Sequence, residues 1–476
     1  MENYLYRFRS AHRLLGNDDV TLGNIFLGEL KTQQIYFAST EELNDPLEGF
    51  KSVHWRGDFI IWKNLIKHYL ICHARQYLKT HDNDETLASQ TTIDINCTIE
   101  DFDSELQVAI AEICQHFFSA PLIEDYINII CRNNRIVQKN ELEVHFQFFH
   151  PITRHIIQTI FHKHGFLNDT HLPKGPAPTH YFGPIIQTVK IASKISDAAL
   201  GVFFTETLYN FLTHTALSNN WKNSIRTRNV ADMYVGLHFP QEFCNALERL
   251  MYPSWYVACF MKSCEDASIW GTYGDGHKGI CLKYKVEASD EKMFINLKLP
   301  PLQQNSSESN SWSSLFFYKV DYGKGHPETN FFVSMARIPK TDLVRYWYKG
   351  DNNDVSICKS WYQSLGTANP NMHIENFTHS FTCKLKAWKK EQEYRLVLDD
   401  FAYDIANKSS RTVTYSLDNL DGVIFGIRTP LEQKLRTLDI VKELCIGNNI
   451  EINVYQAYFD RTDNTIRYYK IQNLNI

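Results

Sequence analysis

The spacing of hydrophobic residues changes along the chain, and the changes predict segments of different secondary structure. Near the start, residues 4–8 and 34–38 are rich in aromatic and β-branched residues, which is typical of strands. Between them, Thr21 is placed to cap a helix that ends near Leu30. The opening of the chain therefore predicts a strand, a helix and a second strand.

A long middle segment, from about residue 55 to residue 250, has a different pattern. Apolar residues recur there at the intervals of amphipathic helices, and strand signals are few. Polar or Pro-rich stretches at 82–98 and 167–179 predict connections between helices. The expected helices cover residues 60–77, 102–131, 141–164 and 185–214.

Strand patterns return after residue 250. A short helix is expected at 265–273 and a longer one at 431–445, and the Ser- and Asn-rich residues 303–314 predict a loop. The expected strands cover residues 254–260, 279–286, 314–320, 393–398, 423–425 and 452–457.

Together these patterns predict an α+β fold. We expect residues 1–50 and 251–476 to form one discontinuous domain with a mixed or antiparallel sheet, and residues 51–250 to form an all-helical insertion. The length of 476 residues agrees with two compact units, because a chain of this size exceeds what one hydrophobic core needs.

Composition narrows the expected partners and compartment. The net charge of −5 provides no basic surplus, so charge does not support nucleic acid as a partner. No apolar run approaches the roughly 18 residues of a membrane span, and the first residues lack the pattern of a signal peptide. Eleven irregularly spaced cysteines indicate reduced thiols. We therefore expect a cytoplasmic protein with no membrane partner.

The charged residues around position 393 form the first candidate site. On a strand, Glu391, Glu393 and Arg395 project from the same face, because side chains alternate with a period of two. Such a face is typical of a solvated strand with a cross-strand ion pair. It also brings together the carboxylates and the guanidinium that an active site needs. The pattern alone leaves both interpretations open.

Residues of the first fifty positions form a second group of candidates. Tyr6, Arg7 and Arg9 lie on or just after the first strand, where they are either core and surface residues or ligand-binding residues. Ser39 and Glu42 have the spacing of a helix capping box, which explains Ser39 without a catalytic role. Asn44 is typical of a turn, although it can also line a pocket.

A glycine-rich segment at 274–279 matches G-x-G-x-x-G. It follows a helix and precedes a strand, which reverses the order of a Rossmann fold and argues against that fold. The loop bearing His277 and Lys278 can still be expected to receive phosphate on its backbone amides. Trp270 and Tyr273 lie three residues apart on the preceding helix, as core residues or as a platform for an aromatic ring.

Histidines of the middle segment do not predict a metal site. His145, His150 and His155 recur every five residues, which spreads them over different faces of a helix. No H-E-x-x-H motif is present in the sequence, and we expect no metal site.

Residues 6–10, 35–48, 259–281 and 388–396 form four blocks. In their order and spacing, these blocks resemble a bacterial family known only as domain of unknown function 2971. The resemblance covers roughly residues 1–50 and 251–476 and leaves the middle segment outside. This family is in turn similar to the ADP-ribosyltransferases, which cleave NAD at the nicotinamide bond. Residues 423–426 also fit this resemblance.

This resemblance implies roles for the candidate residues. Glu393 would stabilise the cationic ribose, Arg9 or Arg7 would grip the dinucleotide, and Ser39 would be the central polar residue. Arg395 would orient Glu393 or bind the NAD phosphates. The transferases often carry a histidine on the first strand, and this chain has none there. The remaining expected contacts to NAD are Tyr6, Tyr36, Asn44, Trp270, Tyr273, His277, Lys278 and Glu391.

The leading hypothesis is therefore an NAD-consuming enzyme, an ADP-ribosyltransferase or NAD glycohydrolase. The resemblance further implies a toxin or an effector of defence against phage. NAD would be the substrate, and a macromolecular acceptor of unknown identity would be the partner, with the helical insertion as a candidate site for it. One alternative is a nucleotide-binding sensor or interaction module without catalysis. A further alternative is a metal-dependent nuclease that uses Glu391 and Glu393.

Overall fold

The computed structural model describes most of the chain. The expected helix at 21–30 falls largely outside the described residues, and its described residues 27–30 are not helical. A short helix, α1 (Ala11–Leu15), lies further upstream. The predicted connections and the loop at 303–314 also lie mostly outside. The described residues are 3–16, 27–45, 47–49, 51–81, 92–168, 179–194, 196–224, 234–289, 292–302, 312–323, 325–326, 328–360, 370–405 and 407–472.

The chain divides into two compact units, and each is described by itself. Unit 1 contains Met1–Phe50, Pro253–Pro327 and Phe377–Ile476, and unit 2 contains Lys51–Tyr252 and Glu328–Asn376. From the sequence pattern, residues 328–376 are expected in the first unit. The structure places them with the second, because β10 (Glu328–Asn330) pairs with β3 (Ser52–Trp55).

Unit 1 is built on a large sheet, and the predicted α+β class is confirmed. The main path runs β15-β14-β13-β6-β1-β5-β11-β9, and its neighbours are antiparallel except for the parallel pair β13–β14. β2, β7, β8 and β12 complete the twelve strands away from this path. The strands are β1 (Asn3–Arg9), β2 (Gln34–Tyr36), β5 (Trp255–Met261), β6 (Ile280–Ser289), β7 (Lys292–Lys298), β8 (Trp312–Phe316), β9 (Tyr318–Lys319), β11 (Glu393–Asp399), β12 (Thr412–Tyr415), β13 (Leu420–Phe425), β14 (Asn453–Asp460) and β15 (Thr465–Lys470).

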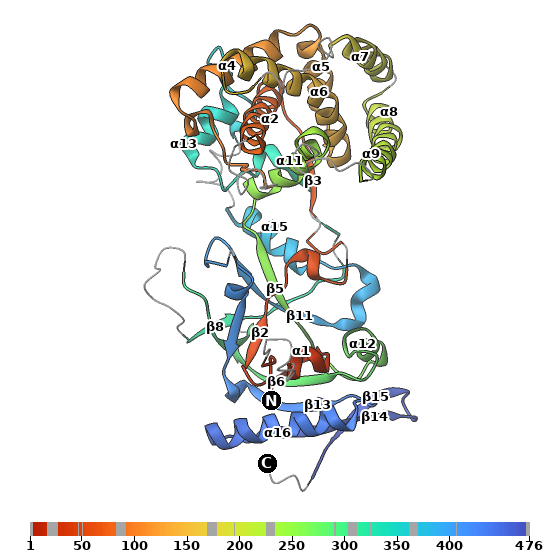
Figure 1. Cartoon of the computed structure of the whole chain (residues 1–476). Coiled ribbons are helices and arrows are strands. Elements are labelled where there is room, and N and C mark those ends of the chain that lie inside the picture. The colour runs from red at the N-terminus through yellow and green to blue at the C-terminus, as the bar shows by residue number, and fades with distance from the viewer. Residues whose placement is uncertain are drawn as a thin grey trace. The chain divides into compact units, whose positions relative to one another are not determined.

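Hydrophobic cores cover both faces of this sheet. Leu5 of β1 packs into the core that includes residues of α1 and α16 (Leu431–Asn448), whereas Tyr6 and Phe8 pack on the opposite face with α12 (Ala267–Tyr273). Figure 1 shows α16 lying along β13 and β14. Because a strand alternates its side chains, a central strand with two covered faces needs apolar residues at successive positions, as β1 has.

The sheet opens beside β1, and this opening positions the candidate site. β1 pairs with β6 along its whole length, from Asn3 to Arg9, but with β5 only at Tyr6 and Met261. Further along β5, the residue paired with Val257 is Ala38, which follows β2. The two strands therefore diverge, and the side chains near their ends face a space between them.

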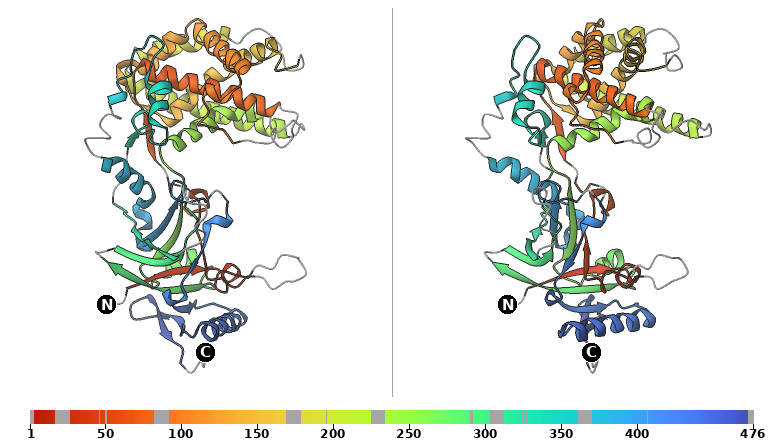
Figure 2. Two further views of the ribbon diagram at one scale, coloured as in Figure 1. Left: turned by 90° about the vertical axis from the view of Figure 1, so that its left-hand side faces the viewer. Right: turned by 60° about the vertical axis from the view of Figure 1, so that its left-hand side comes forward.

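Unit 2 consists mainly of helices, and α2 (Phe59–Thr80) lies among the others (Figure 2). It is not all-helical as predicted, because β10, β3 and β4 (Val137–Gln138) form a small sheet. α15 (Pro370–Thr382) leads from unit 2 into unit 1. The other main helices of unit 2 are α4 (Ser104–Ser119), α5 (Ile123–Cys131), α6 (Lys139–Lys163), α7 (Thr179–Ser193), α8 (Asp197–Val202), α9 (Tyr209–Ser224), α11 (Phe239–Leu247) and the π-helical segment η10 (Leu343–Tyr348).

No single described helix is long and apolar enough to cross a membrane. α4 and the helical residues Ile123–Asn134, bent by 77°, meet the length and composition criteria only as a pair.

Candidate functional site

A cavity of about 370 Å³ lies in unit 1 where β1 and β5 diverge. It is open to solvent on one side, and its walls come from β1, β2, β5, the end of α12 and the start of β11. Its volume lies near the lower end of the range for small-molecule sites. The predicted candidates among its lining residues are Tyr6, Arg7, Arg9, Tyr36, Asn44, Tyr273 and Glu393.

Arg7 is a buried cation in the wall of this cavity. One of its nitrogens, Nη2, donates to the backbone carbonyl of Tyr36 at 3.0 Å, and its guanidinium lies 5.4 Å from the ring centre of Phe260. Its Nε and Nη1 have no hydrogen-bond partner, although the side chain is only 4% exposed. Buried donors without partners cost free energy, so this site favours a ligand that accepts hydrogen bonds.

The other candidates on β1 already have protein partners. Arg9 forms an ion pair with Glu29, in which Nε lies 2.6 Å from the carboxylate. The hydroxyl of Tyr6 shares a hydrogen bond of 3.0 Å with the hydroxyl of Tyr468, and burial raises the pKa of Tyr6. Arg7 is thus the residue of β1 with the greatest unused capacity to bind an anion.

Glu393 also lines the cavity, at the first position of β11. Its backbone N–H donates to the hydroxyl of Tyr322 at 2.9 Å, and its side chain is 1% exposed. Burial opposes ionisation, but the cations of Arg395 and Lys384 outweigh it and lower the pKa of Glu393 to about 2. Glu393 is therefore a buried, ionised carboxylate, and the interpretation of this segment as a solvated strand face is wrong.

Lys384 and Glu48 complete a buried cluster that the sequence pattern does not predict. Lys384 Nζ lies 2.9 Å from Glu48, 2.7 Å from Glu391 and 3.0 Å from Glu393. Glu48 is the last residue of one of the sequence blocks that carry the family resemblance, so its position in that block could have marked it as a candidate. Lys384 lies between α15 and η11 (Lys386–Glu391) and had no such signal.

Glu391 reaches the cluster from outside the strand. It ends η11, and Gln392 has a left-handed backbone with a φ of 44°, so the expected period of two does not hold there. Glu391 accepts a hydrogen bond of 2.6 Å from the hydroxyl of Tyr273, which lines the cavity. Burial, opposed by Lys384, raises the pKa of Glu391. The tertiary structure, and not the alternation of side chains along one strand, therefore brings Glu391 and Glu393 into one cluster.

Arg395 orients Glu393 and does not line the cavity. It is 0% exposed, and its Nε donates to Glu393 at 2.8 Å while Nη1 donates to the carbonyl of Phe381 at 2.9 Å. Nη2 bonds to Glu48. Of its two expected roles, orientation of the carboxylate fits this position, and contact with NAD phosphates does not.

Ser39 is explained by the local backbone. Residues 39–42 form the predicted capping box, in which Glu42 accepts a hydrogen bond of 3.1 Å from the backbone N–H of Ser39. Glu42 also accepts from the hydroxyl of Tyr36 at 2.7 Å. Ser39 itself is not among the residues lining the cavity, whereas Glu42 is.

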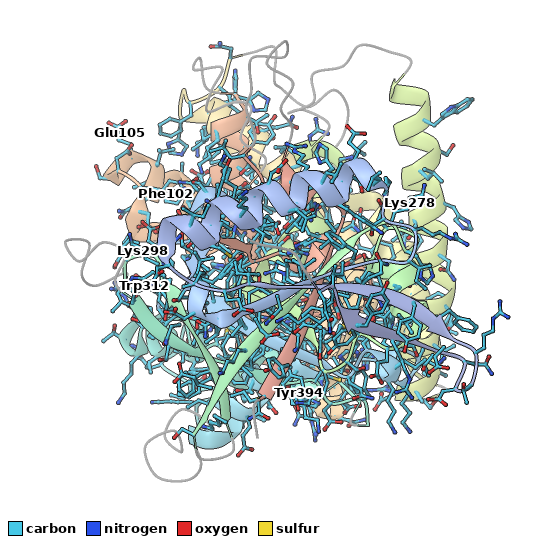
Figure 3. All side chains as sticks on the ribbon, turned by 90° about the horizontal axis from the view of Figure 1, so that it is seen from below. Phe102, Glu105, Lys278, Lys298, Trp312 and Tyr394 are labelled. Atoms are coloured by element: carbon cyan, nitrogen blue, oxygen red, sulfur yellow. The ribbon has the colours of Figure 1, made fainter. Side chains whose placement is uncertain are left out.

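The glycine-rich turn at 274–279 is not a phosphate loop. The amides of Gly276, His277 and Gly279 donate to the carbonyls of Gly271, Trp270 and Gly274, so they are unavailable to a ligand. Lys278 is exposed on the surface of unit 1, and neither it nor His277 lines the cavity (Figure 3). The expected role of this loop in binding phosphate is therefore wrong.

Trp270 is a core residue. Its indole N–H donates to the carbonyl of Cys264 at 2.7 Å, and its ring packs edge-on against Phe8 with centroids 4.8 Å apart. At 1% exposure it offers no face on which a nucleotide ring could stack.

Within the described part of the chain, no group of three or more His, Cys, Asp or Glu side chains is placed to hold a metal ion. His145 and His150 are buried in unit 2, where each shares a hydrogen bond of 2.8 Å with a tyrosine hydroxyl, of Tyr126 and Tyr69 respectively.

Comparison with known proteins gives one match. A family model described as "Protein of unknown function (DUF2971)" matches residues 269–396. No curated protein and no solved structure matches the chain, and nothing found links it to ADP-ribosyltransferases. The matched segment carries Tyr273, Lys384 and Glu393, whereas β1 and β2 lie outside it. Residues 269–396 are therefore similar to this family of unknown function, in agreement with the resemblance seen in the sequence blocks.

Proposed function

We propose that the cavity of unit 1 binds NAD and that the protein cleaves its nicotinamide bond, as an ADP-ribosyltransferase or an NAD glycohydrolase. One observation carries the proposal. Arg7 of β1, Tyr36 of β2 and Glu393 of β11 come from distant parts of the sequence and line the same cavity. A cation that can bind phosphate and a carboxylate in the same cavity are groups that this reaction uses.

The Arg7 wall would bind the pyrophosphate. An arginine offers planar, paired N–H groups that match phosphate oxygens, and Arg7 has unpaired donors at both Nε and Nη1. A phosphate bound there would satisfy the buried donors and compensate the buried charge.

The Glu393 wall would hold the nicotinamide ribose. Cleavage of the nicotinamide bond leaves positive charge on the sugar. An ionised carboxylate nearby stabilises that charge and accepts a hydrogen bond from a ribose hydroxyl. Lys384 and Arg395 keep Glu393 ionised and fix its position. The rings of Tyr36 and Tyr273 supply apolar surface in the same cavity.

A second candidate function is nucleotide binding without chemistry, as in a sensor or interaction module. The observation that favours it is the compensation of Glu393: one oxygen bonds to Arg395 at 2.8 Å and the other to Lys384 at 3.0 Å. These cations reduce the negative potential that Glu393 exerts on a sugar. The same pairing argues against a magnesium-dependent nuclease, because Glu391 and Glu393 are already bound to protein cations.

The experiment is to incubate the purified full chain with NAD and measure released nicotinamide by chromatography. Glu393→Gln should lower the rate by about 100-fold or more, in line with the loss of one group that stabilises transition-state charge. Glu432→Gln, at an exposed position of α16, is the matched control and should retain the wild-type rate.

Binding is measured separately, by calorimetry with NAD. Arg7→Met should weaken binding by about tenfold or more, since it removes a buried, charged donor to phosphate. If the wild type binds NAD without releasing nicotinamide, the result would refute the proposed enzyme and support the nucleotide-binding sensor. Nicotinamide release that Glu393→Gln leaves unchanged would refute the assigned role of that residue.

A further inference from the structure

Unit 2 contains a cavity of its own, of about 450 Å³, which is larger than the cavity of unit 1. Its walls are formed by α2, by residues 95–99, by η10 and by the turn at residues 349–351. None of its lining residues belongs to unit 1. The cavity is therefore a feature of unit 2 alone.

Hydrogen bonds from α2 hold two of the walls in place. Asn64 Nδ2 donates to the carbonyls of Trp347 and Lys349, at 2.8 and 3.0 Å, and so fixes the end of η10. His68 Nε2 bonds to the carbonyl of Ile95 at 2.8 Å, and because a carbonyl only accepts, this nitrogen carries the proton. Walls fixed in this way form a cavity before a ligand arrives, as in most small-molecule sites.

The inner surface offers an aromatic and apolar environment. Ile71, Ile95, Leu250 and Trp347 line it with buried side chains. The ring of His68 lies 4.9 Å from that of Trp347, and burial lowers the pKa of His68 to about 4, so the imidazole adds no charge at neutral pH. This surface suits the apolar body of a ligand.

The charged lining residues carry an excess of positive charge. Four are cationic and two are acidic. Asp351 pairs with Lys63 at 2.7 Å, and Arg345 pairs with Glu100 at 2.5 Å. Lys67 and Lys349 form no ion pair with any residue that the structure describes. The cations are Lys67, Arg337, Arg345 and Lys349, and the acids are Asp342 and Asp351.

The backbone of η10 is a second, independent indication of a ligand site. It is π-helical, a rare conformation that is frequent at functional sites. Three consecutive residues of this segment, Arg345, Tyr346 and Trp347, all line the cavity.

We infer that the cavity of unit 2 is a binding site for a small organic anion with a planar, apolar body. The apolar inner surface would receive the body, and Lys67 and Lys349 would bind the anionic group. This inference does not rest on the proposed reaction of NAD, because it concerns different residues in the other unit.

The test uses two fluorescent probes that share an apolar body. 8-Anilinonaphthalene-1-sulfonate carries a negative charge, and N-phenyl-1-naphthylamine carries none. We expect the full chain to bind the sulfonate at one saturable site, about tenfold more tightly than the neutral probe. Lys67→Glu combined with Lys349→Glu should abolish this preference. Lys194→Glu, an exposed charge change in the same unit, should leave it intact.

Two further variants locate the probe. Ile99→Trp, which enlarges a half-buried lining residue, should displace the sulfonate, whereas Arg7→Met in the cavity of unit 1 should not. Thermal unfolding of each variant separates loss of binding from loss of fold. Equal affinities for both probes, or sulfonate binding that survives both the charge reversal and Ile99→Trp, would overturn the inference.

Discussion

Lys384 illustrates what one side chain does in this protein. Its ammonium contacts the carboxylates of Glu48, Glu391 and Glu393, and Arg395 is the only other cation that contacts these carboxylates among the described residues. Three acids thus face two cations, and the cluster holds either a net negative charge or one extra proton. Burial raises the pKa of Glu391, whereas the neighbouring cations lower that of Glu393, so Glu391 binds a proton more readily than Glu393.

Replacing Lys384 should destabilise unit 1 strongly. Lys384→Met would leave buried carboxylates with one cation, and we expect the free energy of unfolding to fall by about 3–5 kcal/mol. Lys384→Arg keeps the positive charge and should lower the free energy of unfolding by less than Lys384→Met does. Urea unfolding followed by hydrogen exchange in peptides of β5 and β11 would measure the effect. A Lys384→Met protein as stable as the wild type would contradict this account of the cluster.

At the scale of elements, the glycine-rich turn at residues 274–279 packs against the segment that follows β13. The amide of Gly426, just after β13, donates to the carbonyl of Gly279 at 3.1 Å, and the amide of Arg428 donates to the carbonyl of His277 at 2.9 Å. A Cβ atom added at Gly426 would lie 2.3 Å from the carbonyl oxygen of His277. Glycine therefore stands at position 426, where the segment after β13 approaches the turn closely, and these hydrogen bonds join the start of β6 to the end of β13.

Gly426→Ala should accordingly destabilise unit 1, by about 1–3 kcal/mol, since backbone must move to relieve the overlap. Gly271→Ala is the matched control: its Cβ would meet nothing within 4 Å, and alanine favours the helical backbone of α12. Thermal unfolding would compare the two. Equal melting temperatures for Gly426→Ala and the wild type would show that the turn tolerates separation from β13.

At the scale of the whole molecule, the two units should respond differently to acid. Unit 2 buries several imidazoles, and His73 stacks on His150 with ring centroids 4.6 Å apart. Burial lowers the pKa of His150 to about 4 and also lowers that of His73. The unfolded chain takes up these protons near pH 6.5, so the stability of unit 2 falls as the pH decreases from about 6.5 towards 4.

Other groups set the size of this effect. Each imidazole contributes up to about 1.4 kcal/mol per pH unit within that window. Glu143, whose pKa burial raises to about 7, acts in the opposite direction, because the folded state then binds the extra proton. In unit 1 the lowered pKa of Glu393 contributes stability that is lost only as the pH falls from about 4 to about 2.

Calorimetry at pH 7.5 and pH 5.5 should therefore show a larger loss of stability for unit 2 than for unit 1. Hydrogen exchange in peptides of α2 and α6, compared with β5 and β11, would assign the transitions. His150→Gln should reduce the dependence on pH in unit 2. Equal shifts in the two units, or a slope unchanged by His150→Gln, would contradict the role of the imidazoles.

The local pattern of residues determined the type and place of most elements. β1, α2, β5, β11 and α16 lie where hydrophobic periodicity predicted them, because periodicity depends only on neighbours along the chain. The capping box at Ser39 was predictable for the same reason. β7, β12 and β15 were missed, as was the small sheet of unit 2. Their short, mixed sequences become strands only beside a partner.

Only the tertiary structure decided which of the candidate residues meet. The pairing of β1 with β6 and of β11 with β5 brings Arg7 and Glu393 to one cavity, and it buries Trp270 and Arg395 away from a ligand. No local spacing encodes these pairings, because they join residues more than a hundred positions apart. Lys384 stayed hidden for that reason: an isolated lysine is usually a solvated charge, and only the fold places it among three carboxylates.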